Sequence, residues 1–95
     1  MSSTLAADAA PLAQVRFFLD AEADPGLLPR VLLPFARHGL TPDRMWSHRN
    51  AATVHVEIAV EATDEEAALI EGSLRRTVSV RRVSRAADLS ARRAV

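Results

Sequence analysis

The sequence predicts one α+β domain with the element order βαββαβ, and three observations support this prediction. Apolar residues alternate in short runs that are typical of strands, most clearly from Thr53 to Val60. Two other segments repeat apolar residues at helical spacing, one before Gly39 and one after Thr63. The chain has 95 residues, the length of one small domain.

The N-terminal half predicts a strand, a turn and a helix. Residues 15–20 alternate, so we expect a strand that buries its odd-numbered side chains. A turn through residues 24–26 (Asp-Pro-Gly) leads into a helix with apolar positions between Leu28 and Phe35. Gly39 is placed to end this helix, because glycine readily adopts the left-handed conformation of a C′ residue.

The middle of the chain predicts two strands that form a hairpin. Residues 44–48 and 53–60 have strand character, and residues 49–52 are short enough to join them as antiparallel neighbours. Pairing of the strand ends next to this connection sets the expected register. The expected cross-strand pairs are His48–Thr53, Trp46–His55 and Arg44–Glu57.

The C-terminal half predicts a capped helix and a last strand. Thr63 and Glu66 have the T-x-x-E spacing of a capping box, which starts a second helix. A fourth strand is expected from Val78. The doubled Arg81-Arg82 interrupts its alternation, as a β-bulge would.

These elements together predict a ferredoxin-like βαββαβ sandwich. Right-handed crossovers place both helices on one face of a four-stranded antiparallel sheet with the strand order 4-1-3-2. The expected domain covers residues 13–85. Residues 1–12 are expected to be a flexible N-terminal arm, and residues 86–95 a flexible Arg-rich tail.

Composition excludes several classes of function. The chain has no cysteine, so disulfide frameworks, cysteine-based zinc sites and cysteine nucleophiles are excluded. No apolar run reaches the ~20 residues of a membrane span, and no signal peptide is evident, so we expect a cytoplasmic protein. No catalytic motif is recognisable, and we expect no cofactor and no metal.

The net charge is zero but unevenly distributed. All 12 basic residues are arginines, and seven of them lie within the last 21 positions. Such a concentration can indicate an acidic partner or a nucleic acid. Arginines at a helix end and in a solvated strand explain it more simply, since cations are favoured at helix C-termini.

The turn into the first helix is the best candidate for a ligand site. A strand that enters a helix through Asp24, Pro25 and Gly26 leaves backbone N–H groups at the positive end of that helix. Such groups suit a carboxylate or another small anion. The predicted ligand-binding residues of this turn are Asp24, Pro25, Gly26, Leu27 and Leu28.

Several short motifs resemble the ACT domain, a small amino-acid-sensing module, and are most similar to the small regulatory subunit of acetolactate synthase. The matching segments are Gly26-Leu27-Leu28-x-Arg30-Val31, Phe35-x-Arg37-x-Gly39-Leu40, Val54-x-Val56-x-Ile58 and Leu74-x-x-x-Val78-x-Val80-x-x-Val83. The resemblance covers about 70 residues, from Gln14 to Arg85. It implies a non-catalytic subunit that binds a catalytic large subunit of acetolactate synthase type.

The resemblance also implies a homodimer and an amino-acid effector site. Dimerisation would use an edge strand, here Arg44, Met45, Trp46, Ser47 and His48. The implied effector, a branched-chain amino acid, would bind at the turn described above and at Thr41. Ala23 and Thr41 stand where effector-responsive members carry asparagine, so binding is expected to be weak, altered or absent. A stand-alone amino-acid sensor and a structural dimerisation module are the alternatives.

The sheet face opposite the helices suggests two further functions, both less well supported. His48, His55 and Glu57 are potential metal ligands, but they lack a tight motif and are explained by ordinary cross-strand pairing. RNA-binding domains of the same element order stack bases on aromatic residues of the first and third strands. Only Phe18 is so placed here, and Glu57 would repel phosphate, so we expect no nucleic-acid partner.

Overall fold

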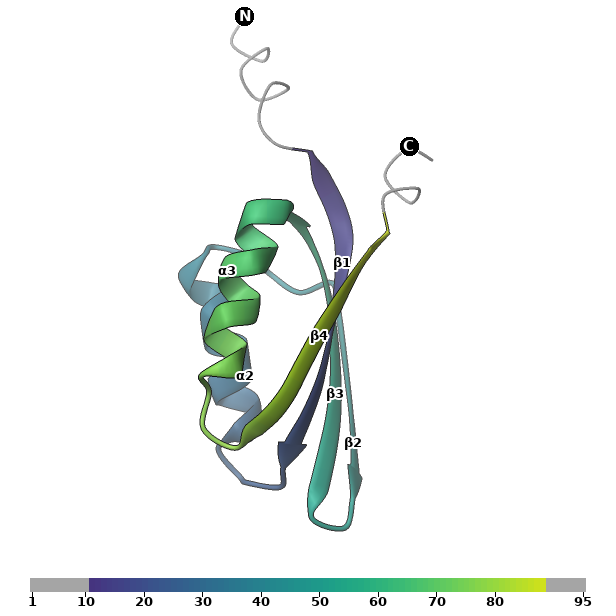
Figure 1. Ribbon diagram of the computed structural model, residues 1–95, viewed down its shortest axis with the longest axis vertical. Helices are drawn as coiled ribbons and strands as arrows, with labels where there is room; N and C mark the ends of the chain where they lie inside the picture. Colours follow the sequence, from purple (N-terminus) through teal and green to yellow (C-terminus); the bar gives the residue numbers. More distant parts are fainter. Residues whose placement is uncertain (1–10, 89–95) are drawn as a thin grey trace, which may run out of the picture.

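The computed structural model describes residues 11–88 as two helices packed on one face of a four-stranded sheet (Figure 1). The strands are antiparallel and lie in the order β2-β3-β1-β4. This order is the predicted 4-1-3-2 read from the other edge, so the ferredoxin-like fold is confirmed. The elements are β1 (Leu12–Glu22), α2 (Leu27–Arg37), β2 (Arg44–Asn50), β3 (Thr53–Thr63), α3 (Asp64–Arg75) and β4 (Val80–Asp88).

The strands are longer than predicted, because backbone pairing continues past the alternating apolar segments. Strand β1 pairs with β3 from Leu12 to Glu22 and with β4 as far as the pair Gln14–Asp88. Strand β4 therefore extends three residues past the predicted domain end at residue 85. The predicted arm and tail otherwise fall on residues 1–10 and 89–95, outside the described residues.

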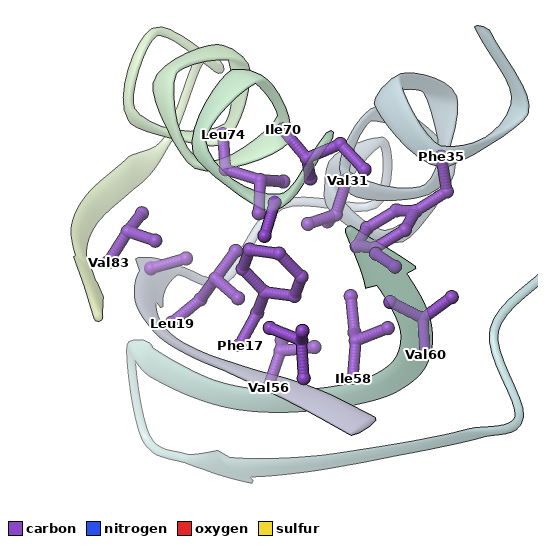
Figure 2. Packing of buried hydrophobic residues seen from close by; sticks show 14 of the residues in the cluster. Phe17, Leu19, Val31, Phe35, Val56, Ile58, Val60, Ile70, Leu74 and Val83 are labelled. Atoms are coloured by element: carbon purple, nitrogen blue, oxygen red, sulfur yellow. The ribbon is translucent and has the colours of Figure 1, made fainter. Parts of the chain in front are cut away.

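The core lies between the sheet and the helices (Figure 2). Phe17 of β1 and Phe35 of α2 meet edge to face, with ring centroids 5.5 Å apart and planes at 83°. Aromatic pairs favour this geometry because the positive edge of one ring meets the negative face of the other. The largest side chains that are almost wholly buried are Phe17, Phe35, Leu19, Leu27, Ile58, Ile70, Leu74, Val15, Val31 and Val60.

Two apolar residues that were expected to begin an element are exposed. Helix α2 begins at Leu27, and its buried stripe passes through Leu27 and Val31, whereas Leu28 is 37% exposed. Val78 is 66% exposed because it lies in the turn before β4 and not in the strand itself. Both errors concern the first residue of an element, where periodicity carries the least information.

Two local predictions are confirmed. The Thr63 hydroxyl accepts a hydrogen bond from the Glu66 N–H at 3.1 Å, and the Glu66 carboxylate accepts one from the Thr63 N–H at 2.9 Å. This reciprocal pair is the predicted capping box of α3. The bulge is present as well: Arg82 pairs with Asp20 and Val80 with Ala21, which leaves Arg81 as the extra residue.

The predicted hairpin register is wrong. The structure pairs His48 with His55, Trp46 with Glu57 and Arg44 with Ala59. The loop contains only two residues, Ala51 and Ala52, because Ala51 adopts a left-handed conformation with φ of 58°. That conformation is unfavourable for alanine, and nothing in an Ala-Ala pair signals it.

The register error does not change which side of the sheet each residue faces. The shift is by two residues, and side chains alternate with a period of two. Met45, Ser47 and Arg49 of β2 therefore face the helices, and Arg44, Trp46 and His48 face away from them. We call the side away from the helices the open face; its central residues are Arg44, Trp46, His48, His55, Glu57, Ala59, Arg16, Phe18, Asp20, Arg82, Ser84 and Ala86.

Within residues 11–88, neither helix is long and apolar enough to cross a membrane.

Replacement of Ala51 by glycine is expected to stabilise the hairpin. A left-handed conformation raises the energy of the folded state by about 1–2 kcal/mol for alanine but not for glycine. Glycine in turn destabilises the folded state by about 0.5–1 kcal/mol, because its backbone loses more conformational entropy on folding. We expect Ala51→Gly to raise the free energy of unfolding by about 0.5–1 kcal/mol in urea denaturation. The adjacent Ala52→Gly is the matched control and should lower it, so equal effects of both variants would contradict the turn geometry.

Candidate functional site

Asp24 connects three elements at one end of the sheet. Its Oδ1 accepts a hydrogen bond from the Gly26 N–H at 3.0 Å. Its Oδ2 accepts one from Arg30 Nη1 of α2 at 2.6 Å and one from the Ser79 hydroxyl at 3.0 Å. The turn after β1, the first turn of α2 and the entry to β4 are therefore held by one carboxylate.

The backbone of Ser79 adopts an unusual conformation at this junction. Its φ is 80°, in the left-handed region, where a residue with a Cβ is strained. The Ser79 carbonyl accepts a hydrogen bond from the Glu22 N–H at 2.8 Å, and its hydroxyl donates to Asp24. These two bonds, from β1 and from the turn that follows it, hold Ser79 in place.

Contacts with three donors lower the pKa of Asp24 from its ordinary value of 3.8 to about 2. The hydrogen bond from Arg30 has the largest effect, followed by those from Gly26 and Ser79. All three favour the charged carboxylate over the protonated acid. Asp24 is thus a carboxylate throughout the physiological pH range.

The backbone N–H groups of the turn were predicted to bind a ligand, but two of them donate hydrogen bonds within the turn. Gly26, and not Asp24, is the N-cap residue of α2, and the Gly26 and Leu27 N–H groups both donate to Asp24. Pro29 has no N–H, and the Arg30 N–H donates to the Gly26 carbonyl. Within this turn, the N–H groups of Asp24 and Leu28 have no acceptor among the described residues, and that of Leu28 lies in the first turn of α2.

Gly26 allows Arg30 to fold back onto Asp24. Its φ of −88° is accessible to every residue type, so glycine is not required here for a left-handed backbone conformation. A Cβ at Gly26 would, however, lie 2.9 Å from Arg30 Nη2. A larger residue would therefore displace the guanidinium from Asp24.

A hollow of about 490 Å³ opens beside this junction. Four of the five predicted turn residues line it, and Gly26 does not. The far wall comes from the hairpin, with Ser47 and Arg49 of β2 and Val54 of β3. The lining residues are Ala23, Asp24, Pro25, Leu27, Leu28, Ser47, Arg49 and Val54.

Arg49 is the positively charged residue that lines this hollow, and it was not among the ligand-binding residues predicted from the sequence. It pairs with Val54, so it faces the helix side of the sheet as Val54 does. Its Nε donates to the Ala51 carbonyl at 2.9 Å, which holds the side chain near the hairpin turn. Its position follows from the two-residue loop, which pairs Arg49 with Val54, and the sequence carries no signal for that loop.

Thr41 lies apart from the hollow. It follows the C-terminal end of α2, whereas the turn precedes the N-terminal end. A helix of 11 residues is about 16 Å long, so one chain does not bring Thr41 and the turn together.

The potential metal ligands of the open face do not form a site in the described structure. His48 and His55 are cross-strand partners, and His55 Nδ1 lies 2.5 Å from Asp20 Oδ1. Glu57 is paired with Arg16 at 3.4 Å. Among residues 11–88 there is no group of three side chains with metal-ligand chemistry and suitable spacing.

Removal of the Asp24 charge is expected to destabilise the fold in a pH-dependent manner. Because the folded-state pKa is depressed, the stabilisation is present above 3.8 and is lost as the pH falls toward 2. Asp24→Asn should therefore lower the melting temperature at neutral pH, and its difference from the wild type should shrink between those two pH values. Asp43→Asn, which removes a carboxylate bonded to the Gln14 amide, controls for the loss of one negative charge. A constant difference across this range would contradict the assigned role of Asp24.

Comparisons with known proteins agree with this architecture. A model of the ACT-like domain family matches residues 8–94. A homoserine dehydrogenase from Thiobacillus denitrificans is similar in structure, with a TM-score of 0.71, 16% identity and coverage of 82% of this chain and 18% of that one. The ACT domain of GTP pyrophosphokinase from Chlorobium tepidum has a TM-score of 0.65, 13% identity and coverage of 79% and 96%.

A separate regulatory subunit has the same fold. The regulatory subunit of aspartate kinase from Thermus thermophilus gives a TM-score of 0.61 at 15% identity and covers 80% of this chain and 53% of its own. A search of curated protein sequences finds no match. Identities this low show a shared fold only, but the family model extends over nearly the whole sequence. The chain therefore belongs to the ACT-like domain family.

Proposed function

We propose that this chain is a non-catalytic regulatory domain that binds a free amino acid in the hollow beside Asp24. The observation that carries the proposal is the position of Arg49 across the hollow from the turn at the start of α2. An amino acid offers a carboxylate, an ammonium group and a side chain, and the hollow has a complementary group for each.

Each part of the ligand has a defined counterpart in this proposal. The ligand carboxylate pairs with the Arg49 guanidinium, and the Leu28 N–H is a second donor at the positive end of α2. The ammonium group faces the Asp24 carboxylate. The ligand side chain rests against Leu28 and Val54, and these apolar walls favour a branched aliphatic side chain.

We further propose that the regulated enzyme is a catalytic subunit of acetolactate synthase, which this chain does not itself contain. The motif resemblance supports this choice, and the aspartate kinase regulatory subunit is an example of the same fold in a separate regulatory chain. Addition of the purified chain to such a large subunit should increase acetolactate formation or protect the enzyme from inactivation. No binding to any large subunit, combined with tight amino-acid binding, would favour the stand-alone sensor.

Self-association through β2 completes the proposal. Strand β2 is an edge of the sheet, and residues Arg44–His48 leave one row of backbone groups without a strand partner among the described residues. An isologous antiparallel pair of such strands would form a continuous eight-stranded sheet. Because Ser47 and Arg49 belong to β2, the amino-acid site would then lie beside the dimer interface.

The Arg49 assignment is tested by calorimetric titration with valine, leucine and isoleucine. We expect millimolar affinity for the wild type and a loss of about tenfold or more for Arg49→Gln, because a charged hydrogen-bond partner is removed. Arg37→Gln, at the far end of α2, should bind as the wild type does. Binding that is unchanged in Arg49→Gln would show that the site lies elsewhere.

The dimer is tested by light scattering at micromolar concentration. Trp46 is the midpoint of Arg44–His48, so an isologous pair places the two copies of Trp46 opposite each other. Trp46→Glu should dissociate the dimer, because two carboxylates would then face each other across the interface. Leu69→Glu is the matched control, since Leu69 is 53% exposed and Trp46 is 55% exposed. A wild-type protein that remains monomeric would refute the dimer.

A further inference from the structure

A second hollow lies on the open face of the sheet, away from the amino-acid site. Its volume is about 280 Å³, and it is lined by Arg44, Trp46, Glu57 and Ala59. A neighbouring hollow of about 340 Å³ shares Arg44, Glu57 and Ala59 with it and extends toward Arg16. We call the first hollow the depression; the carboxylates of Asp43 and Asp88 line the neighbouring hollow and not the depression.

The strand register explains why this depression exists. Arg44 of β2 and Arg16 of β1 are the two cross-strand neighbours of Ala59. Side chains directly opposite each other in a sheet have Cβ atoms about 4.5–5.5 Å apart, so the small Ala59 leaves space between two long arginines. Ala59 is only 7% exposed, which shows that its neighbours enclose it.

Trp46 forms a flat wall of the depression. One face of its indole stacks on the His48 imidazole, with centroids 5.8 Å apart and an angle of 13° between the planes. The depression lies on the other side, toward Arg44 and Ala59. Trp46 is 55% exposed, and the stacked His48 ring holds the orientation of its indole. The ring face of the indole that does not contact His48 is therefore accessible to a planar group.

Arg44 and Glu57 are the two charged residues that line the depression, and they differ in their ion-pair partners. Arg16 Nη1 lies 3.4 Å from Glu57 Oε2, so these two charges largely offset each other. Arg44 has no carboxylate in ion-pair contact among residues 11–88. A guanidinium beside an exposed aromatic wall suits a ligand that combines a planar ring with one carboxylate, since it can form two parallel hydrogen bonds with that group.

We propose that this depression binds a small planar aromatic carboxylate. The aromatic ring stacks against Trp46 above Ala59, and the carboxylate pairs with Arg44. The site does not depend on the proposed amino-acid site, because Arg44 and Trp46 project from the open face whereas Ser47 and Arg49 project toward the helices. The same strand thus has a separate ligand site on each side of the sheet.

The single tryptophan of the chain reports directly on this site. Benzoate titrated into the full-length protein should quench Trp46 fluorescence and reach saturation in the millimolar range. Benzamide has the same ring without the charge, and cyclohexanecarboxylate has the charge without the planar ring. Both should bind about tenfold more weakly than benzoate, as should benzoate to Arg44→Gln.

Arg82→Gln is the matched control, because Arg82 is on the open face but does not line the depression. It should bind benzoate as the wild type does. Quenching that rises linearly without saturation, at the same rate as for free N-acetyltryptophanamide, would overturn the proposal. Equal affinity for benzoate and benzamide, or an unchanged affinity in Arg44→Gln, would also overturn it.

Discussion

The Asp24 carboxylate is the interaction on which the rest of the site depends. It accepts hydrogen bonds from the turn, from Arg30 of α2 and from Ser79 before β4. The residues it joins are up to 55 positions apart in the sequence. Leu27 anchors the start of α2 in the core, and the Asp24 carboxylate adds the polar contacts that join this helix start to the entry of β4. Loss of the carboxylate would therefore loosen one wall of the proposed amino-acid hollow.

Strand β2 contributes the other half of the functional surface. The two-residue turn at Ala51 and Ala52 sets its register against β3. That register directs Arg49 and Ser47 toward the helices and the turn, and directs Arg44 and Trp46 to the open face. One edge strand therefore carries residues of both proposed ligand sites and of the proposed dimer contact, so ligand binding and self-association would be coupled through β2.

Most of the fold could be predicted from the sequence, because the relevant signals are local. Period-two alternation indicated the strands, the Thr63–Glu66 spacing indicated the start of α3, and the doubled arginine indicated the bulge. The hairpin register could not be predicted, since it depends on a positive φ at Ala51. An alanine in the sequence does not indicate this conformation. The wrong register nevertheless kept every face correct, because an error of two residues preserves alternation.

The candidate site was predicted only in part. The sequence identified the turn, but it did not show that Asp24 accepts hydrogen bonds from the Gly26 and Leu27 N–H groups, which were expected to bind a ligand. That contact also involves Ser79, and tertiary proximity of this kind leaves no local pattern. Arg49 was missed for a related reason, since its place opposite the turn follows from the hairpin register.

The most direct test of this account is an NMR titration of the Asp24 side-chain carboxyl carbon. If the carboxylate is held by Arg30, Gly26 and Ser79 as described, its chemical shift should titrate with a pKa of about 2. A midpoint near 3.8, the ordinary value for aspartate, would show that the three contacts do not persist in solution. The junction that positions the proposed amino-acid site would then be absent.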